Sequence, residues 1–269
     1  MSTWPYRIMR EQRVIRTLVV SLSVMLLAAA CDDYDDDDGY NPVEPSPPVA
    51  TVISGSGAVL AKVEEYRALL GEPRNGGNVP GPAQSGRREV NWEGVPAATL
   101  NSNTFPGDFF AATTKLGLLM TTTGNGLRVS DNDFSDLKAE FGDAFNAFSG
   151  SKTFVSVGTA VVDVTFQVAA GTASALVAGF GVVFEDVDVL GSAKLEAFDA
   201  AGKKLGTFNA PIRTDATGHS FVGFKFETPI VARVRITSGS AALGAQVTDG
   251  GGVDLVAMDD FLYSEPVAK

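Results

Sequence analysis

The sequence predicts a mainly β protein: an antiparallel β-sandwich of the jelly-roll type, with one N-terminal amphipathic helix and one short internal helix. From residue 87 onward, apolar and polar residues alternate in many short segments, and turn-forming residues separate these segments. Many short strands at even spacing are typical of sandwiches and jelly rolls. The stretch after residue 57 is long enough for one domain, which we expect to span residues 58–266.

Residues 58–70 are predicted to form the N-terminal helix. Val59, Val63, Tyr66 and Leu70 recur at helical spacing, the charged residues lie mostly off their face, and a glycine follows. Such a helix buries one face, and we expect it to pack on the sheet.

The short internal helix is predicted within residues 134–148. Four phenylalanines recur there at nearly helical spacing. Gly142 lies between them and lowers the helix propensity of the segment.

About eleven strands are predicted from period-two alternation. The clearest is residues 161–168, in which every second residue is valine or phenylalanine. Residues 199–203 contain turn-forming residues between two such runs, which predicts a hairpin. The predicted strands are residues 90–92, 116–121, 127–130, 153–157, 161–168, 178–184, 195–198, 205–208, 222–226, 232–237 and 253–263.

The last predicted strand, residues 253–263, is apolar on both faces and should therefore be covered on both sides. The helix at residues 58–70 is the expected outer cover. Asp259 and Asp260 are adjacent on this strand, so we expect their side chains to point to opposite faces. A buried carboxylate is costly unless it is paired; the candidate partners are Arg87, Arg88 and a calcium ion.

Asp186 and Asp188 are predicted to lie together at a strand end. They continue the inward face of the preceding strand to the point where core gives way to solvent. Carboxylates gathered at such a place suit calcium, which takes about 6 to 8 oxygen ligands. The alternative is a solvated acidic turn with ion pairs. Asp186, Asp188, Asp259 and Asp260 are thus the candidate metal ligands, and calcium is the expected cofactor.

Trp92 is the candidate ligand-binding residue, because it is the only tryptophan after residue 30 and an indole can stack on a sugar ring. The alternative is a core position beside Val90. His219, the only histidine, lies in a segment that predicts a loop tip, and no Gly-x-Ser-x-Gly elbow is present to supply a nucleophile. We therefore predict no catalytic residues and no enzymatic activity.

The first 30 residues have the composition of a signal peptide. Four arginines precede an uncharged apolar run, residues 17–30, which is shorter than the roughly 20 residues that a membrane span needs. The run ends in three alanines before Cys31, the only cysteine. This junction resembles the lipobox of bacterial lipoproteins. The resemblance implies acylation of Cys31, for example with palmitate, and lipid anchoring to a membrane of the cell envelope. The alternatives are an ordinary secreted protein and an uncleaved anchor.

Residues 31–57 are predicted to be an acidic, proline-rich disordered tether, because they combine a run of aspartates with several prolines. Residues 1–30 hold four of the 21 basic and one of the 32 acidic residues, which leaves a net charge of −14 after residue 30. This charge argues against a nucleic-acid partner, whose binders carry a basic footprint.

Four segments resemble a recurrent domain of exported bacterial proteins: residues 86–92, 184–188, 233–239 and 258–261. That domain is similar to galactose-binding-like jelly rolls of carbohydrate-binding modules. The resemblance implies that calcium is common and that a terminal strand with paired aspartates lies beside the first strand. The expected function is a membrane-anchored, non-enzymatic binding module for a glycan, with structural calcium; the alternative is a structural or adhesive envelope protein with a protein partner.

Overall fold

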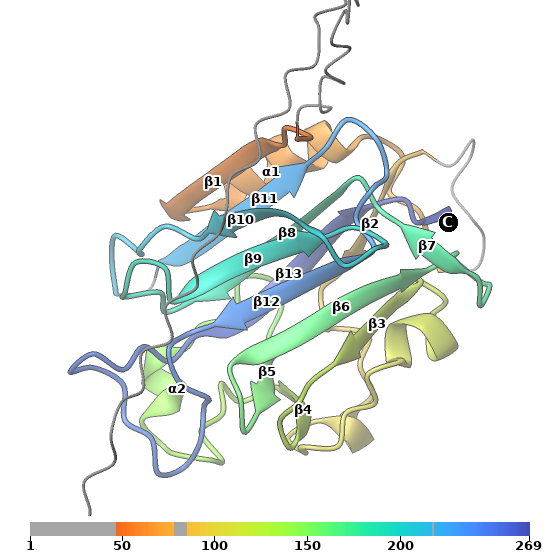
Figure 1. The fold of residues 1–269 in the computed structure, drawn as a ribbon. Coiled ribbons are helices and arrows are strands. Elements are labelled where there is room, and N and C mark those ends of the chain that lie inside the picture. Colours follow the sequence, from red (N-terminus) through yellow and green to blue (C-terminus); the bar gives the residue numbers. More distant parts are fainter. Residues whose placement is uncertain (1–46, 78–84, 217) are drawn as a thin grey trace, which may run out of the picture. The chain divides into compact units, whose positions relative to one another are not determined.

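Two antiparallel β-sheets packed face to face make up the fold (Figure 1). The computed structural model describes residues 47–77, 85–216 and 218–269. The predicted fold class, a mainly β antiparallel sandwich with few helices, is confirmed. No helix within these described residues is long and apolar enough to span a membrane.

Sheet A, as we name the first sheet, has the strand order β1-β11-β8-β13-β5-β4, with β2 paired to β13. Its central strand β13 pairs antiparallel with β8, β5 and β2. The bounds are β1 Thr51–Gly57, β2 Arg87–Val90, β4 Gly126–Ser130, β5 Thr153–Val157, β8 Gly179–Glu185, β11 His219–Lys225 and β13 Ala257–Ser264.

Sheet B, the second sheet, has the order β10-β9-β12-β6-β7-β14, with β3 paired to β6. The predicted hairpin is confirmed, because β9 and β10 pair antiparallel around residues 199–203. The bounds are β3 Leu118–Thr121, β6 Val161–Gln167, β7 Ser174–Leu176, β9 Ala193–Phe198, β10 Lys204–Asn209, β12 Arg233–Ser238 and β14 Val267–Ala268.

The main hydrophobic core fills the space between the two sheets. Alternate residues of β6, β9 and β12 are buried there, and they meet the inward residues of β8, β11 and β13. Aromatic rings dominate the sheet A side, where Phe180 and Phe261 pack 5.6 Å apart between ring centroids. This core gives both sheets their rigidity and fixes which side chains point outward.

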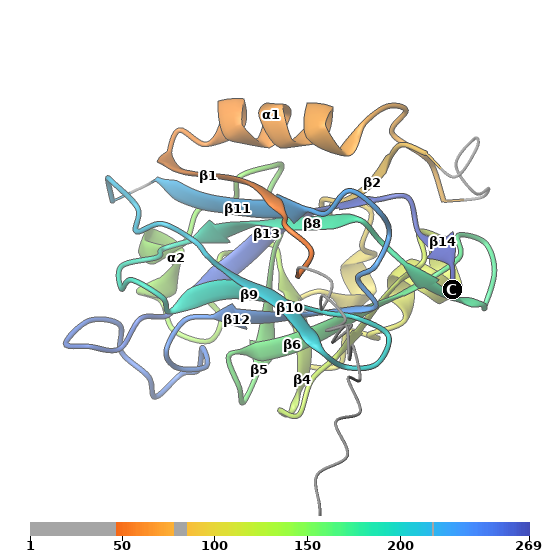
Figure 2. The same cartoon turned by 45° about the horizontal axis from the view of Figure 1, so that its top comes forward.

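The helix α1, Leu60–Leu70, covers the outer face of sheet A (Figure 2). Its Tyr66 is fully buried and donates a hydrogen bond of 2.6 Å from its hydroxyl to the Phe224 carbonyl. The ring lies against Gly181 and Gly223, which pair with each other in the sheet; a Cβ on either would come within 2.8 Å of it. The glycines in these strands therefore make room for the tyrosine.

The predicted start of the domain differs from the structure. Residues 51–57 were expected in the tether but form β1, whose seven residues all pair with β11. Their serines and glycines suit a linker, yet strand pairing uses the backbone, which every residue supplies. The short internal helix predicted within residues 134–148 is present as α2, Phe141–Ala144, and occupies only part of that segment. Phe134 has a left-handed φ of 60°, and the chain is already extended at Phe145.

The last strand is covered on both sides, as predicted, since all eight residues of β13 are buried. On its outer side Leu262 packs in the cluster that α1 forms with sheet A. Ala257 lies in a third cluster, which α2 and the loop before residue 257 complete. The helix is therefore one of two outer covers of this strand.

Candidate functional site

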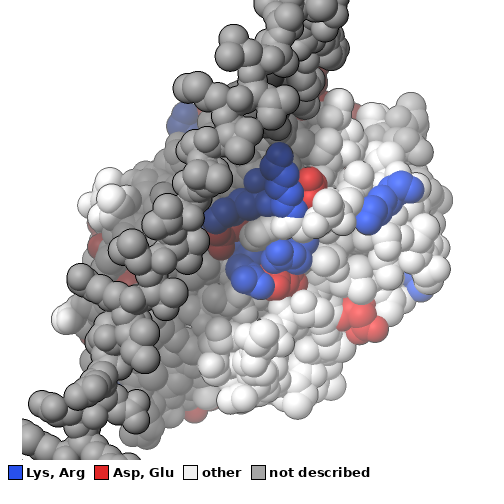
Figure 3. All heavy atoms as spheres, in the orientation of Figure 1, with Lys and Arg blue, Asp and Glu red and all other residues white. Residues whose placement is uncertain are grey.

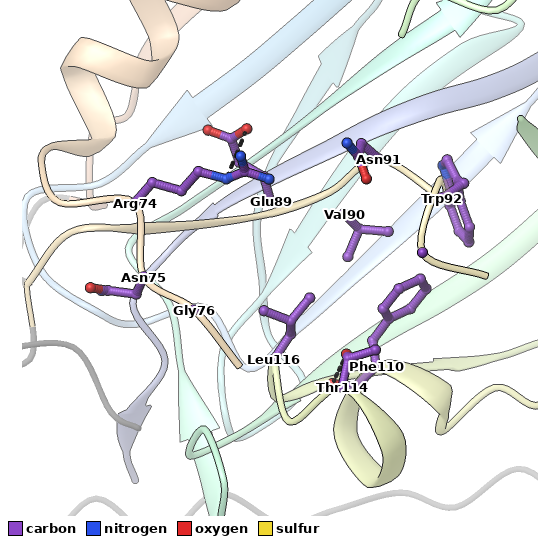
Figure 4. A pocket seen from close by; sticks show the side chains of 11 residues that line it. Arg74, Asn75, Gly76, Glu89, Val90, Asn91, Trp92, Phe110, Thr114 and Leu116 are labelled. Atoms are coloured by element: carbon purple, nitrogen blue, oxygen red, sulfur yellow. Dashed lines mark hydrogen bonds and ion pairs between the residues drawn. The ribbon is translucent and has the colours of Figure 1, made fainter. Parts of the chain in front are cut away.

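A pocket of about 400 Å³ lies beside β2 and is a candidate ligand site, because it combines apolar side chains with charged and amide groups (Figure 4). It brings together the segment after α1, the end of β2, and the short π-helix η3, Phe109–Thr113, with the residues that follow it. The lining residues are Arg74, Asn75, Gly76, Glu89, Val90, Asn91, Trp92, Gly94, Phe110, Thr114 and Leu116. We call this the β2 pocket.

The apolar side of the β2 pocket consists of Val90, Trp92, Phe110 and Leu116 (Figure 4). Val90 and Trp92 are both only 1% exposed. The last residue of β2 is Val90, and the chain then turns through a left-handed φ of 63° at Trp92. These residues give the pocket an apolar wall that the main core holds rigid.

Trp92 does not offer a ring face to solvent. Its indole stacks on Phe154 with 4.3 Å between ring centroids and an 8° angle between planes. Its Nε1 donates a hydrogen bond of 2.9 Å to the Asp259 carbonyl. Trp92 therefore fits the core alternative, and the idea that it stacks openly on a sugar does not fit this placement. It reaches a ligand only as part of the pocket wall.

The polar side of the pocket carries opposite charges. The Arg74 side chain is 55% exposed, and its Nε lies 3.6 Å from the nearly buried Glu89 carboxylate. Burial by itself would raise the pKa of Glu89, but hydrogen bonds from Arg87 and Arg67 outweigh it and lower the pKa. Glu89 is thus a fixed anion, while Arg74 and Asn91 offer hydrogen-bond donors at the rim.

None of the residues that line the β2 pocket is a serine, cysteine or histidine. His219 lies elsewhere, at the first position of β11 rather than at the predicted loop tip. Its Nε2 lies 2.6 Å from the Asn146 carbonyl, and its ring packs edge-on against Phe148. The arrangement of the pocket suits binding of a polar molecule with an apolar side.

The structure brings Asp186 and Asp188 together at the end of β8, as expected, and Arg213 binds both. The Arg213 Nε lies 2.6 Å from Asp188, and its Nη1 pairs with Asp186. Burial raises the pKa of Asp186 to about 7, although Arg213 opposes the shift. A guanidinium therefore takes the position in which a calcium ion was expected.

Asp259 and Asp260 were expected on opposite faces, and this is wrong. The register of β13 against β8 shifts between Met258 and Phe261, so a β-bulge contains both aspartates. A bulge breaks the simple alternation of a strand. Both carboxylates consequently reach Ser149, whose Oγ lies 2.6 Å from Asp260 and 3.4 Å from Asp259.

The partners of this aspartate pair also differ from the expected ones. Backbone N–H groups of Phe148 and Ser149 donate to Asp259 at 2.6 and 2.9 Å. Arg67 of α1 lies 3.4 Å from Asp260. Burial, and next the charge of Asp260, raise the pKa of Asp259 to about 8.

The candidate arginines bind other carboxylates. Arg87 pairs with Glu89 and Glu72, and Arg88 pairs with Glu265 at 2.8 Å between Nε and Oε2. Both arginines are almost fully buried. The sequence of β2 does not show which carboxylates its arginines bind. All four residues of this strand are buried on either face, so polar and apolar residues do not mark an inner and an outer side.

Glu185 is a buried acid that the sequence reasoning missed. It is the last residue of β8 and 1% exposed. Burial raises its pKa well above the usual value, and the charges of Asp259 and Asp133 add to this. Glu185 alternates in phase with Gly181 and Val183, which lie on the face of sheet A that α1 covers. This phase is the sequence signal that could have predicted its burial.

Calcium fits these aspartates poorly. In the part of the chain that the structure describes, no three acidic, histidine or cysteine side chains are grouped so that they could hold a metal ion. Arginines and backbone N–H groups already bind the four candidate carboxylates. Calcium remains a prediction for which these residues offer no evident site.

The predicted lipidation site, Cys31, lies outside the described residues, as do the signal peptide and the first part of the tether. Comparison with known proteins adds no family: no protein-family model matches the chain, and no curated protein matches its sequence. The geometry of the described residues is therefore the basis for the function proposed below.

Proposed function

We propose that this chain is a membrane-anchored, non-enzymatic binding module of the cell envelope that binds a glycan in the β2 pocket. The observation that supports the proposal best is the pocket itself. It has a volume of about 400 Å³ and sets a rigid apolar wall opposite Arg74, Asn91 and Glu89. Small-ligand sites are commonly of about 300 to 1,000 Å³ and combine apolar walls with a few placed polar groups.

A sugar matches these two sides. Its ring C–H groups are apolar and would pack against the wall at Val90 and Leu116. Its hydroxyls both donate and accept hydrogen bonds, so they can pair with the Arg74 guanidinium, the Glu89 carboxylate and the Asn91 amide. A wholly apolar ligand would displace water from the Asn91 amide and the Arg74 guanidinium without offering them a hydrogen-bond partner, which costs binding energy.

The binding test is a glycan array probed with residues 31–269 carrying Cys31→Ser, which retains every described residue. We expect binding to a defined class of glycans. Asn91→Ala and Arg74→Ala should each weaken it by about five- to tenfold, since a hydrogen bond contributes about 1 kcal/mol or slightly more. Gln246→Ala and Lys62→Ala are matched controls at exposed positions away from the pocket.

Two results would count against the glycan proposal. If the folded protein binds no glycan, the alternative function gains weight, namely a structural or adhesive protein with a protein partner. If a glycan binds and neither pocket variant weakens it, the ligand lies elsewhere on the domain. Circular dichroism and melting curves establish that each variant is folded.

The anchor has a separate test. Cells that express the full chain are labelled with radioactive palmitate, and the protein is then fractionated. We expect label on the chain and recovery with membranes; Cys31→Ser should lose the label and move to the soluble fraction. Unlabelled protein would leave an ordinary secreted protein as the better description. This test is independent of the glycan proposal.

A further inference from the structure

The outer face of sheet B is open, in contrast to that of sheet A. Burial along its strands alternates: β6, β9 and β12 each bury every second residue, while the residues between are partly exposed. The helix α1 packs on sheet A, and α2 packs in a cluster with Val155 and Ala257 of the same sheet. The side chains of this face are therefore available to a partner.

Strand pairing arranges the outward residues in rows across the sheet. One row runs Lys204, Phe198, Arg233 and Thr165, as the registers of β10, β9, β12 and β6 show. The next row runs Thr207, Glu196, Arg235 and Asp163. Lys194 follows on β9. Neighbours in such rows lie about 5 Å apart, so the charges form one surface.

Lysine and arginine dominate this surface. Figure 3, in the view of Figure 1, shows basic side chains gathered over the middle of the face with acidic ones among them. The basic residues are Lys194, Lys204, Arg233 and Arg235, and the acidic ones are Glu196 and Asp163. A net positive surface is unusual in a chain with a net charge of −11.

The two arginines are held in fixed positions. Both bind Asp163, Arg233 at 2.9 Å and Arg235 at 2.9 and 2.8 Å. The Arg233 guanidinium also lies 3.8 Å from the centre of the Phe198 ring. The single Asp163 carboxylate thus orders two guanidinium groups but neutralises the charge of only one. The Arg233 side chain remains 28% exposed and that of Arg235 41% exposed. Ordered donors lose little entropy when they bind an anion.

Two hollows extend the surface along β6. One, of about 450 Å³, is lined by Val161, Asp163 and four threonines; the other, of about 310 Å³, includes Thr165, Gln167 and Ser174. The outward residues of β6 are every second residue from Val161 to Gln167. At about 3.3 Å per residue this stretch spans about 20 Å. This length and the many hydroxyl groups suit an extended chain of sugars.

We infer that the outer face of sheet B binds an acidic polysaccharide, with Arg233, Arg235 and Lys194 binding its carboxylates and the threonines and Gln167 binding its hydroxyls. The charge balance favours this partner. Double-stranded DNA carries one charge per about 1.7 Å and would be repelled by the acidic remainder of the domain and by Glu196. A polymer with wider charge spacing places its carboxylates on the arginines and its hydroxyls beside Asp163.

The test uses residues 31–269 with Cys31→Ser and, as the probe, oligomers of polygalacturonate, with dextran of similar length as the neutral comparison. Calorimetry is run at low and at physiological salt. We expect binding of the polyuronate only, weakened by salt because screening reduces the attraction. Arg233→Ala combined with Arg235→Ala should weaken it at least about tenfold, the effect of losing charged hydrogen bonds.

The matched control removes the same charge elsewhere: Lys62→Ala on α1 with Lys138→Ala before α2, whose side chains are 47% and 21% exposed and belong to no strand of sheet B. It should change the affinity less than about twofold, as separate surface sites act independently. Lys194→Glu provides a second variant that leaves the arginine–Asp163 contacts in place. Asn91→Ala, in the β2 pocket, should leave polyuronate binding unchanged, so the failure of this inference and of the glycan proposal can be told apart.

Three outcomes would overturn the inference. The first is a folded protein that does not bind polyuronate at low salt, and the second is an equal loss of affinity in the arginine pair and its lysine control. A third is tighter binding to vesicles of anionic phospholipid or to duplex DNA than to the polyuronate, which would assign the face to a different class of partner.

Discussion

The outer faces of the two sheets differ in how they treat charge. On sheet A, α1 and the segment around residues 141–149 cover the strands, so Glu89, Glu185 and Asp260 are buried with their partners or neighbours. On sheet B, Asp163 binds its two arginines at the surface. Similar ion pairs therefore have different consequences: covered pairs hold the layers together, whereas open ones remain available to a ligand.

The largest expected effect comes from breaking a covered pair. Glu89→Gln removes the anion that Arg67 and Arg87 share, and leaves two nearly buried guanidinium groups with less compensation. We expect the free energy of unfolding to fall by about 3 kcal/mol or more. Asp163→Asn, its counterpart on sheet B, should cost less than about 1 kcal/mol. Urea denaturation measures both, and equal losses would contradict the comparison.

The close approach of α1 to sheet A gives the next effect. In Gly223→Ala, the new Cβ would lie 2.7 Å from the Tyr66 ring, so the helix or the ring must shift. Overpacking of this kind costs about 1 to 3 kcal/mol. Gly244→Ala places its Cβ at an ordinary 3.7 Å from Val247 and should have little effect. Equal melting temperatures for the two variants would contradict the close packing of the Tyr66 ring against Gly223.

The buried acids of sheet A should make stability depend on pH. The pKa of Asp259 is about 8 in the folded protein, while an unfolded aspartate has a pKa of about 4. The folded state keeps a proton that the unfolded state loses, so the free energy of unfolding falls as the pH rises from about 4 to 8.

Asp259→Asn should remove much of this dependence, up to about 1.4 kcal/mol per pH unit for one proton. The control variant Asp143→Asn, at an exposed position, should retain the pH dependence of the parent protein. Unfolding free energies measured at pH 5, 6.5 and 8 provide the comparison. A variant as pH-dependent as the parent protein would show that Asp259 titrates normally.

The smallest expected effect concerns calcium. Because Arg213 binds Asp186 and Asp188, and Arg67 lies beside Asp260, we expect millimolar calcium or a chelator to leave the melting temperature unchanged. Differential scanning fluorimetry on residues 31–269 with Cys31→Ser is sufficient. A melting temperature that rises with calcium and returns with the chelator would restore the calcium prediction and show that an arginine can be displaced.

Local patterns predicted the regular parts of the fold. Alternation placed β5 at its observed bounds, and helical spacing placed α1 within two residues of its start. Pairing between distant segments lies beyond such patterns. The sequence of β1 resembles a linker, and only the edge of β11 makes it a strand.

The candidate site shows the same division. Asp186 and Asp188 meet at a strand end because strand phase dictates it, while Arg213, which binds them, follows about 25 residues later in the chain. The bulge at Asp259 leaves no mark in the alternation, because both faces of β13 are covered. The β2 pocket forms from three segments whose approach depends on the whole fold.

The position of β1 has a mechanical consequence. It is the first described strand and an edge of sheet A, and it contributes Ile53 to the cluster that holds α1. With the chain anchored at Cys31 as proposed, tension from the membrane would load the seven residue pairs between β1 and β11 before any other ladder. Detaching β1 would loosen α1, so the first part of the domain to yield under force would be the cover of sheet A, while the open face of sheet B stayed intact.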